Sequence, residues 1–295
     1  MKSRFHFLYV PRSASRFAGI FGALAAALVA GSASAHSDVL LVNVGGKATI
    51  GAAEDIGGPG QSFDLDAKVF EGILLAGGLL PPHLAKDFEG DEPGFFALDA
   101  VAGGADLSTL GAAALPAGAG VSINLTSFSL GGGAGEVLYW SGVGAPAFEP
   151  VAAGITFGFE PALNFGTTGA GGSLDAHPIY QLDDGVAGKP TDGVYVIAPS
   201  ISVAGLGSSD PFYLVLLVDQ LIVSEDDAEE LEEALEAYHE GLAPDAMFGG
   251  KNFAFYEEAV EFVEEAVDVP EPAALALAAT ALAWGAIGLR GRRQD

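Results

Sequence analysis

The fold of this chain is decided by the stretch Asp210-Pro211-Phe212-Tyr213-Leu214-Val215-Leu216-Leu217-Val218. From Phe212 onward, aromatic and aliphatic side chains follow one another, which is typical of a central strand. Residues 194–203 have a similar composition and precede this stretch across a glycine- and serine-rich turn. In residues 121–130 apolar and polar side chains nearly alternate, which indicates a strand with one buried face. The centre of the chain is therefore predicted to be β-structure.

Glycine-rich turns divide the rest of the β-structure into short strands. Residues 38–50 contain two apolar runs around Gly45-Gly46, the pattern of a β-hairpin. Residues 136–140 follow a second glycine-rich turn and are expected to pair with the strand at 121–130. About six to nine short strands separated by turns predict a mainly β fold, an antiparallel β-sandwich-like domain over residues 36–223.

Residues 224–268 form an acidic segment with a helical pattern. Ser224 and Asp227 have the spacing of a capping box, with Asp in place of Glu. Apolar residues then repeat at intervals of three and four in two stripes. The stripes are Ala228, Leu231, Leu235, Tyr238 and Leu242, and Tyr256, Ala259, Val260, Val263 and Val267. This pattern fits two helices that lie on the sandwich, or a charged stalk that holds the domain off a membrane.

The charge of the chain limits its partners. The sequence has 12 Lys and Arg against 39 Asp and Glu, and residues 36–268 retain only five lysines and no arginine against 37 acids. Such a region has no basic stripe for a phosphate backbone, so nucleic acid is excluded as a partner. The acidity suits solubility in salty surroundings or the binding of divalent cations. No cysteine is present, which excludes disulfides and thiolate ligands.

Residues 1–35 have the features of an export signal peptide. Basic residues precede the apolar run at 17–30, and Ala33-Ser34-Ala35 is an A-x-A cleavage site. The small residues of this site favour a signal peptide over a transmembrane helix. Cleavage after Ala35 would make His36 the first residue of the mature protein.

The C-terminal segment, residues 269–295, has three parts. Val269-Pro270-Glu271-Pro272 must end the preceding helix, because proline lacks a backbone donor and restricts the residue before it. Residues 273–289 carry no charge and would reach about 25 Å as a helix, the short end of what spans a bilayer. A basic cluster follows, which would stay on the cytoplasmic side. Its members are Arg290, Arg292 and Arg293. The segment is therefore predicted to contain a transmembrane helix at 273–289.

This order of a Val-Pro-Glu-Pro break, an apolar span and a terminal arginine cluster resembles the PEP-CTERM sorting signal of exported bacterial proteins. In that family a membrane enzyme, exosortase, recognises the signal. The resemblance implies a precursor anchored in the inner membrane, cleavage near Pro270-Glu271-Pro272, and delivery to the cell surface or extracellular matrix. An ordinary C-terminal membrane anchor is the alternative. The resemblance covers only the last 25 or so residues and implies no activity for residues 36–268. Within that region three short motifs loosely resemble exported PEP-CTERM proteins of unknown activity: His36-Ser37-Asp38, Glu92-Pro93-Gly94-Phe95 and Ser209-Asp210-Pro211-Phe212.

A metal site is predicted at the start of the mature chain. An N-terminal His36 would offer its α-amine and a ring nitrogen to one ion, as in copper histidine braces, and such ligands suit copper, zinc and nickel. Asp38 supplies a nearby carboxylate, and His177, beside Asp175, is the first choice for a second imidazole. Alternatively, His36 is a chance result of leader cleavage, and His177 is a turn residue ahead of Pro178.

No catalytic motif is present: the sequence has no Gly-x-Ser-x-Gly elbow, phosphate-binding glycine loop or His-Glu-x-x-His helix. We therefore expect a non-enzymatic surface or matrix protein that binds no cofactor and whose partner is an extracellular polysaccharide or the cell surface. The alternative is a surface metal-binding protein that uses His36, or acidic loops that hold calcium. The turn-rich loop at 86–95 has alternating oxygen ligands, although it lacks the EF-hand pattern.

Overall fold

The computed structural model describes residues 38–54, 56, 61–81, 84–161, 164–184 and 190–268, and within these ranges the chain is mainly β-structure with three helices. The strands are β1 (Asp38–Val44), β2 (Lys47–Glu54), β3 (Ser62–Asp64), β4 (Val69–Leu75), β5 (Phe88–Gly90), β6 (Phe95–Ala97), β7 (Gly120–Thr126), β8 (Phe128–Leu130), β9 (Gly133–Gly135), β10 (Val137–Trp140), β11 (Glu149–Pro150), β12 (Thr156–Glu160), β13 (Asn164–Thr167), β14 (Leu174–Ala176), β15 (Ile179–Asp183), β16 (Gly193–Val203), β17 (Tyr213–Asp219), β18 (Met247–Phe248) and β19 (Lys251–Asn252). The helices are α1 (Gly104–Thr109), α2 (Glu225–His239) and α3 (Ala254–Asp268).

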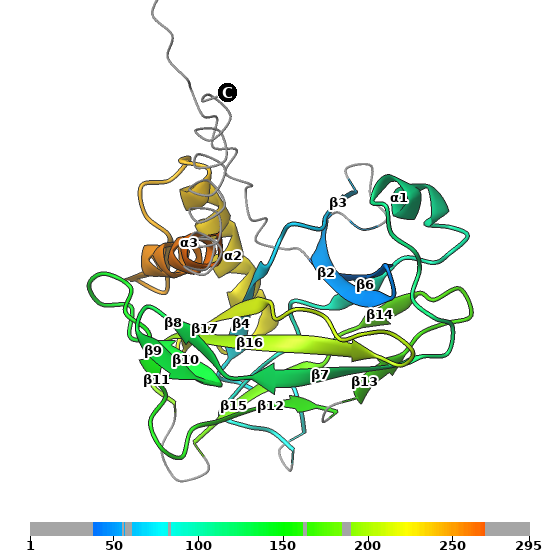
Figure 1. The fold of residues 1–295 in the computed structure, drawn as a ribbon. Helices are drawn as coiled ribbons and strands as arrows, with labels where there is room; N and C mark the ends of the chain where they lie inside the picture. The colour runs from blue at the N-terminus through cyan, green and yellow to red at the C-terminus, as the bar shows by residue number, and fades with distance from the viewer. Residues whose placement is uncertain are drawn as a thin grey trace, which may run out of the picture. The chain divides into compact units, whose positions relative to one another are not determined.

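The strands form two large sheets (Figure 1). The smaller has the order β14-β6-β1-β2-β3, and the larger has the order β11-β10-β16-β17-β4-β5-β15-β12, with β7 paired to β16 and β13 paired to β7. Most neighbours are antiparallel, as predicted, but β1–β6 and β17–β4 are parallel. These parallel partners are far apart in sequence, so no hairpin fixes their direction and a long crossover connects them.

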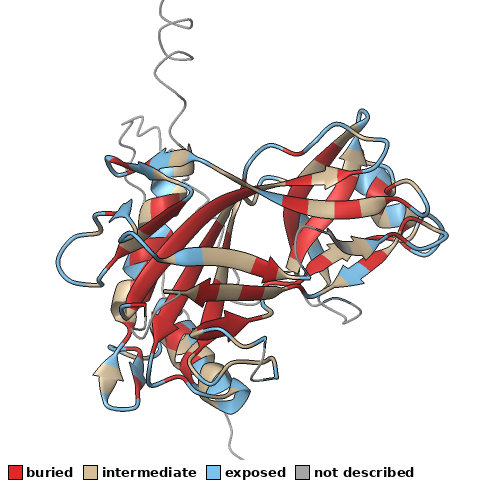
Figure 2. Cartoon of the chain, turned by 90° about the horizontal axis from the view of Figure 1, so that it is seen from below, coloured by how far each residue is buried: buried red, intermediate tan, exposed pale blue. Residues whose placement is uncertain are grey.

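Residues 213–218 of the stretch lie in β17, which is near the middle of the larger sheet, as predicted, and is buried on both faces. Leu214 and Leu216 lie in an apolar cluster that also contains residues of the smaller sheet. Val215 and Leu217 point the other way, into a cluster that contains residues of α2 and α3. Figure 2 shows buried residues concentrated along the long strands of the sheets. The larger sheet is therefore covered on one face by the smaller sheet's side chains and on the other by the helix pair.

The predicted hairpin at residues 38–50 is confirmed, and its two turn glycines explain it. In the β1–β2 hairpin, Val44 pairs with Lys47, and Gly45 and Gly46 have φ values of 60° and 88°, in the left-handed region that favours glycine. The prediction that residues 136–140 pair with 121–130 is wrong. That glycine turn joins β8 to β9, while β10 pairs with β16, because both edges of β7 are occupied by β13 and β16.

The two helices lie on the larger sheet. The Ser224 side chain caps α2 by accepting from the Asp227 N–H, and the Asp227 carboxylate accepts from the Val223 N–H. Leu231 and Leu235 are buried, and so are all but the last residue of the second stripe, but Leu242 lies beyond the helix end and is 76% exposed.

No helix in the described part of the chain is both long and apolar enough to cross a membrane. The predicted signal peptide with its Ala33–Ala35 cleavage site, His36, and the C-terminal segment with its helix at 273–289 all lie outside the described residues.

Candidate functional site

A cleft of about 830 Å³ lies between α2, β4 and the loop that follows β5. Its two ends are chemically different. At one end Glu71 of β4 lies under the helices, near Tyr256 of α3. At the other end His177 lies beside Asp38 and the β5–β6 loop. The lining residues are Asp38, Ala53, Ile56, Glu71, Gly72, Ile73, Leu75, Gly90, Asp91, Glu92, Pro93, His177, Glu225, Ala228, Glu229, Glu232, Glu233, Leu235 and Tyr256. Eight of these are acidic and none is Lys or Arg, so the cleft has a strongly negative potential.

The alternation of β4 places Glu71 under the helices. Phe70 and Leu74 point into the cluster shared with the smaller sheet, whereas Ile73 and Leu75 point into the cluster shared with α2 and α3. Glu71 is on the same face as Ile73 and Leu75, because successive strand residues point to opposite faces. A carboxylate is therefore inserted into a face that is otherwise packed with apolar side chains, at the point where this face lines the cleft.

The environment of Glu71 disfavours its charged form. Burial, followed by the negative charges of Glu257, Glu264 and Glu232, raises its pKa from 4.5 to about 8. Its carboxylate has no hydrogen bond or ion pair with any residue in the described ranges. The side chain is enclosed by protein yet retains some solvent exposure, because it borders the cleft.

Tyr256 of α3 fixes the helix over this end of the cleft. Its buried hydroxyl donates to the Val215 carbonyl of β17 at 2.8 Å and accepts from the Gly72 N–H of β4 at 3.1 Å. One side chain thus satisfies backbone groups on two parallel strands. Because the hydroxyl would be costly to bury unpaired, this contact determines how α3 lies on the sheet.

At the other end, His177 lies among carboxylates. Its Nδ1 is 3.2 Å from Glu92 Oε1, and its Nε2 is 3.4 Å from Asp175 Oδ1. The hydrogen bond to Glu92 is the largest cause that raises the His177 pKa, and despite partial burial the negative charges of Glu92, Asp38 and Asp175 help bring the value to about 9. The imidazole is therefore a cation at neutral pH, with both nitrogens protonated and facing acceptors.

A glycine allows His177 and Asp38 to meet. A Cβ on Gly94 would lie 2.4 Å from His177 Cε1 and 2.8 Å from Asp38 Oδ1, so both side chains pack against bare backbone. The Gly94 N–H donates to Asp38 Oδ1 at 3.1 Å and to Glu92 Oε2 at 2.8 Å. Burial raises the pKa of Asp38, and Glu92 raises it further.

Two of the three predicted metal ligands, Asp38 and His177, are thus brought together, whereas His36 lies outside the described residues. Glu92, which contacts His177 directly, was not among the predicted ligands. It lies in the acidic loop at 86–95 that the sequence shows, but nothing local in the sequence indicates that this loop lies next to the histidine. Glu71 was also missed, because a single acid in an apolar run is an ordinary feature of a strand with one exposed face.

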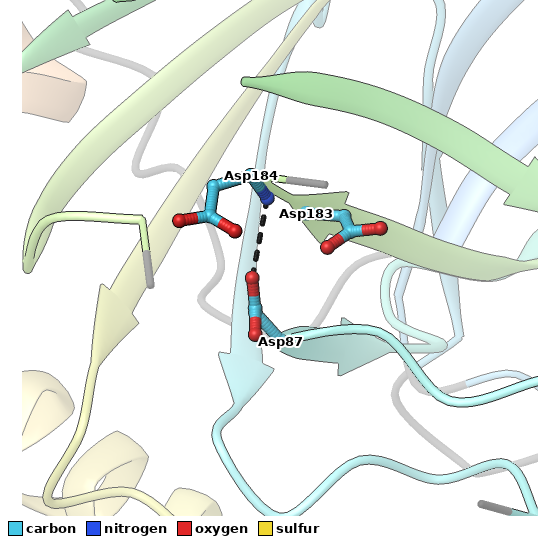
Figure 3. Close-up of side chains that lie close together, drawn as sticks. All are labelled: Asp87, Asp183 and Asp184. Carbon is cyan, nitrogen blue, oxygen red and sulfur yellow. Dashed lines mark hydrogen bonds between the residues drawn. The ribbon is translucent and has the colours of Figure 1, made fainter. Parts of the chain in front are cut away.

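A separate acidic group lies beside β5 and β15. One ligand oxygen each from Asp87, Asp183 and Asp184 lie within 4.8 Å of one another (Figure 3), and this is the one such group among the described residues. Asp87 accepts from the Asp184 N–H at 3.2 Å, and Lys86 Nζ lies 2.8 Å from Asp183 Oδ2. Burial raises the pKa of Asp87. The lysine already neutralises part of the charge that a cation would balance.

No family model matches the chain, and neither a curated protein nor a solved structure matches it either. The function of this chain is therefore inferred from its own residues and geometry.

Proposed function

We propose that this chain is a non-enzymatic exported protein of the cell surface or extracellular matrix, sorted through its C-terminal PEP-CTERM-like signal by an exosortase-type enzyme. The observation that carries the proposal is the order of features along the sequence. The A-x-A site at Ala33–Ala35 comes first, and the Val269-Pro270-Glu271-Pro272 break with its apolar span and arginine cluster comes last. The region between these two predicted signals contains an extensive buried core.

The packing supports a domain that can exist without its terminal segments. Leu40, the third residue of β1, is completely buried, and Val263 near the end of α3 is buried as well. In this proposal residues 36–223 are a sandwich-like β domain, and the acidic helices of residues 224–268 belong to its outer surface. The partner in this proposal is an extracellular polysaccharide or another component of the cell surface.

The sorting proposal is tested by following the full chain in a bacterium that has an exosortase and in the same strain without it. We expect a mature form that lacks the C-terminal segment and is recovered from the surface or matrix, and a longer, membrane-bound form when the enzyme is absent. Replacing Pro270 and Pro272 with Ala should give the longer form even in the presence of the enzyme. Equal processing with and without exosortase would favour an ordinary anchor and contradict the proposal.

A second candidate is a surface metal-binding protein, which is favoured by the meeting of Asp38 and His177 at Gly94. A metal bound there by His36 and His177 would have to displace the proton that the carboxylates hold on His177. Metal content of the exported protein, measured by mass spectrometry, tests this. One copper or zinc per chain that is lost in both His36→Ala and His177→Gln, and retained in His239→Gln, is the expected result. Unchanged metal content in the first two variants would exclude it.

A further inference from the structure

The acids of the cleft are spread out and do not converge on a point. The three ligand atoms within 4.8 Å of one another that a single ion requires are found, among the described residues, only in the Asp87 group, which is outside the cleft. The cleft's carboxylates instead extend from Glu71 on β4, along α2, to Asp91 and Glu92 after β5. Such a distribution matches a ligand that carries several positive charges at separate positions.

One of these acids, Glu71, has no partner although most of its side chain is enclosed by protein. It lies beneath the helices, makes no hydrogen bond or ion pair with the described residues, and keeps some exposure where it borders the cleft. A carboxylate that has lost much of its hydration and has no partner is costly in its charged form. An ammonium group entering the cleft would stabilise the charged form of Glu71 and supply up to three hydrogen-bond donors.

The surface between the charges is apolar. Ile73 and Leu75 of β4, Leu235 of α2 and the ring of Tyr256 line the cleft next to the carboxylates. A Mg²⁺ or Ca²⁺ ion binds oxygen ligands or water and gains nothing from such a surface. A chain of methylene groups buries apolar area against it.

We propose that this cleft binds an aliphatic polyamine, with one ammonium group at the Glu71 carboxylate, methylene groups over Ile73 and Leu75, and further ammonium groups at the acids of α2 and of the β5–β6 loop. This binding function goes beyond the export and sorting of the chain, and it does not depend on them. The occupant has the chemistry of spermidine, in which ammonium groups are separated by three or four carbons.

The test is a calorimetric titration of the full chain, purified in a mild detergent, with spermidine and separately with Mg²⁺ and Ca²⁺ at matched ionic strength. We expect saturable binding of about one spermidine per chain, at least tenfold tighter than either metal ion. Tighter binding of a metal ion than of spermidine, or no saturable spermidine binding, would overturn the proposal. This comparison uses the unaltered protein and is independent of the folding of any variant.

Two variants locate the site. The titrations are made at about pH 8.5, where the Glu71 carboxyl is mostly ionised. Glu71→Gln then keeps the size of the side chain and removes its charge, so we expect at least a tenfold loss of spermidine affinity. Glu230→Gln, on α2 but not among the residues that line the cleft, makes the same change of net charge and should alter the affinity by less than twofold. Equal losses in both variants would show a response to net charge alone and would refute a site at Glu71.

Discussion

Replacing Glu71 with Gln should stabilise the protein, and increasingly so as the pH rises. Glu71 titrates at about 8 in the folded chain against an ordinary value of 4.5, a difference of about 3.5 units. In the unfolded chain the carboxyl loses its proton near pH 4.5, while the folded chain holds it until about pH 8. The folded state therefore binds more protons between these values, and the free energy of unfolding falls as the pH rises across this window.

The magnitude follows from the shift. Each unit corresponds to about 1.4 kcal/mol, so the full shift has a ceiling of about 5 kcal/mol at pH 9. Water in the cleft screens the neighbouring acids of α2 and α3, namely Glu232, Glu257 and Glu264, and we expect about half of that ceiling. Gln cannot ionise, so the variant avoids the loss. Its advantage over the unaltered protein should grow by about 1.5–3 kcal/mol between pH 5.5 and pH 9.

The assay is urea denaturation of both proteins at several pH values, and the comparison is the difference between their free energies of unfolding. Taking the difference removes the contribution that the other carboxylates make equally to the pH dependence of both proteins. Glu230→Gln is the matched control, because Glu230 is exposed on α2 and should give a difference that is small and flat with pH. A flat difference for Glu71→Gln as well, or a variant less stable than the parent at pH 9, would refute the description of Glu71 as a largely enclosed acid without a partner.

Three further results are expected. Tyr256→Phe leaves backbone groups of β4 and β17 without their side-chain partner and should cost about 1–3 kcal/mol in urea denaturation, whereas a neutral result would mean that water replaces the hydroxyl. Ser224→Ala removes the α2 cap and should cost about 1 kcal/mol, with faster amide exchange at Asp227 than in the parent. Glu92→Gln should lower the pKa of His177 from about 9 toward 6.5 in an NMR titration, and an unchanged value would assign the shift to other neighbours.

The features that the sequence predicted well are local ones. The Gly45-Gly46 hairpin, the Ser224 cap and the central strand at 213–219 each depend on residues adjacent in the chain. Strand pairing was harder to predict, because pairs such as β10–β16 and β17–β4 join segments that are far apart in sequence. These pairings depend on which strand faces are buried together, and no turn motif in the sequence indicates them.

In the candidate site, too, some features could be predicted from the sequence, and those set by long-range packing could not. The meeting of Asp38 and His177 was predicted from their chemistry, while Glu92 was not, because its contact depends on where the β5–β6 loop crosses the histidine. Alternation along β4 places Glu71 on the same face as Ile73, but the covering of that face by α2 and α3 is decided by residues more than 150 positions later.

The Tyr256 hydroxyl also has a mechanical consequence. α3 is the last described element before Pro270, so a pull on the chain beyond that point enters the fold through this helix. Tyr256 lies on its first turn, away from the pulled end, and joins the helix to both β4 and β17. The force would be carried along α3 to the two parallel strands at the middle of the larger sheet. A protein tethered by its C-terminus would thus resist extension at its best-packed strands, and the turns of α3 after Tyr256 would yield first.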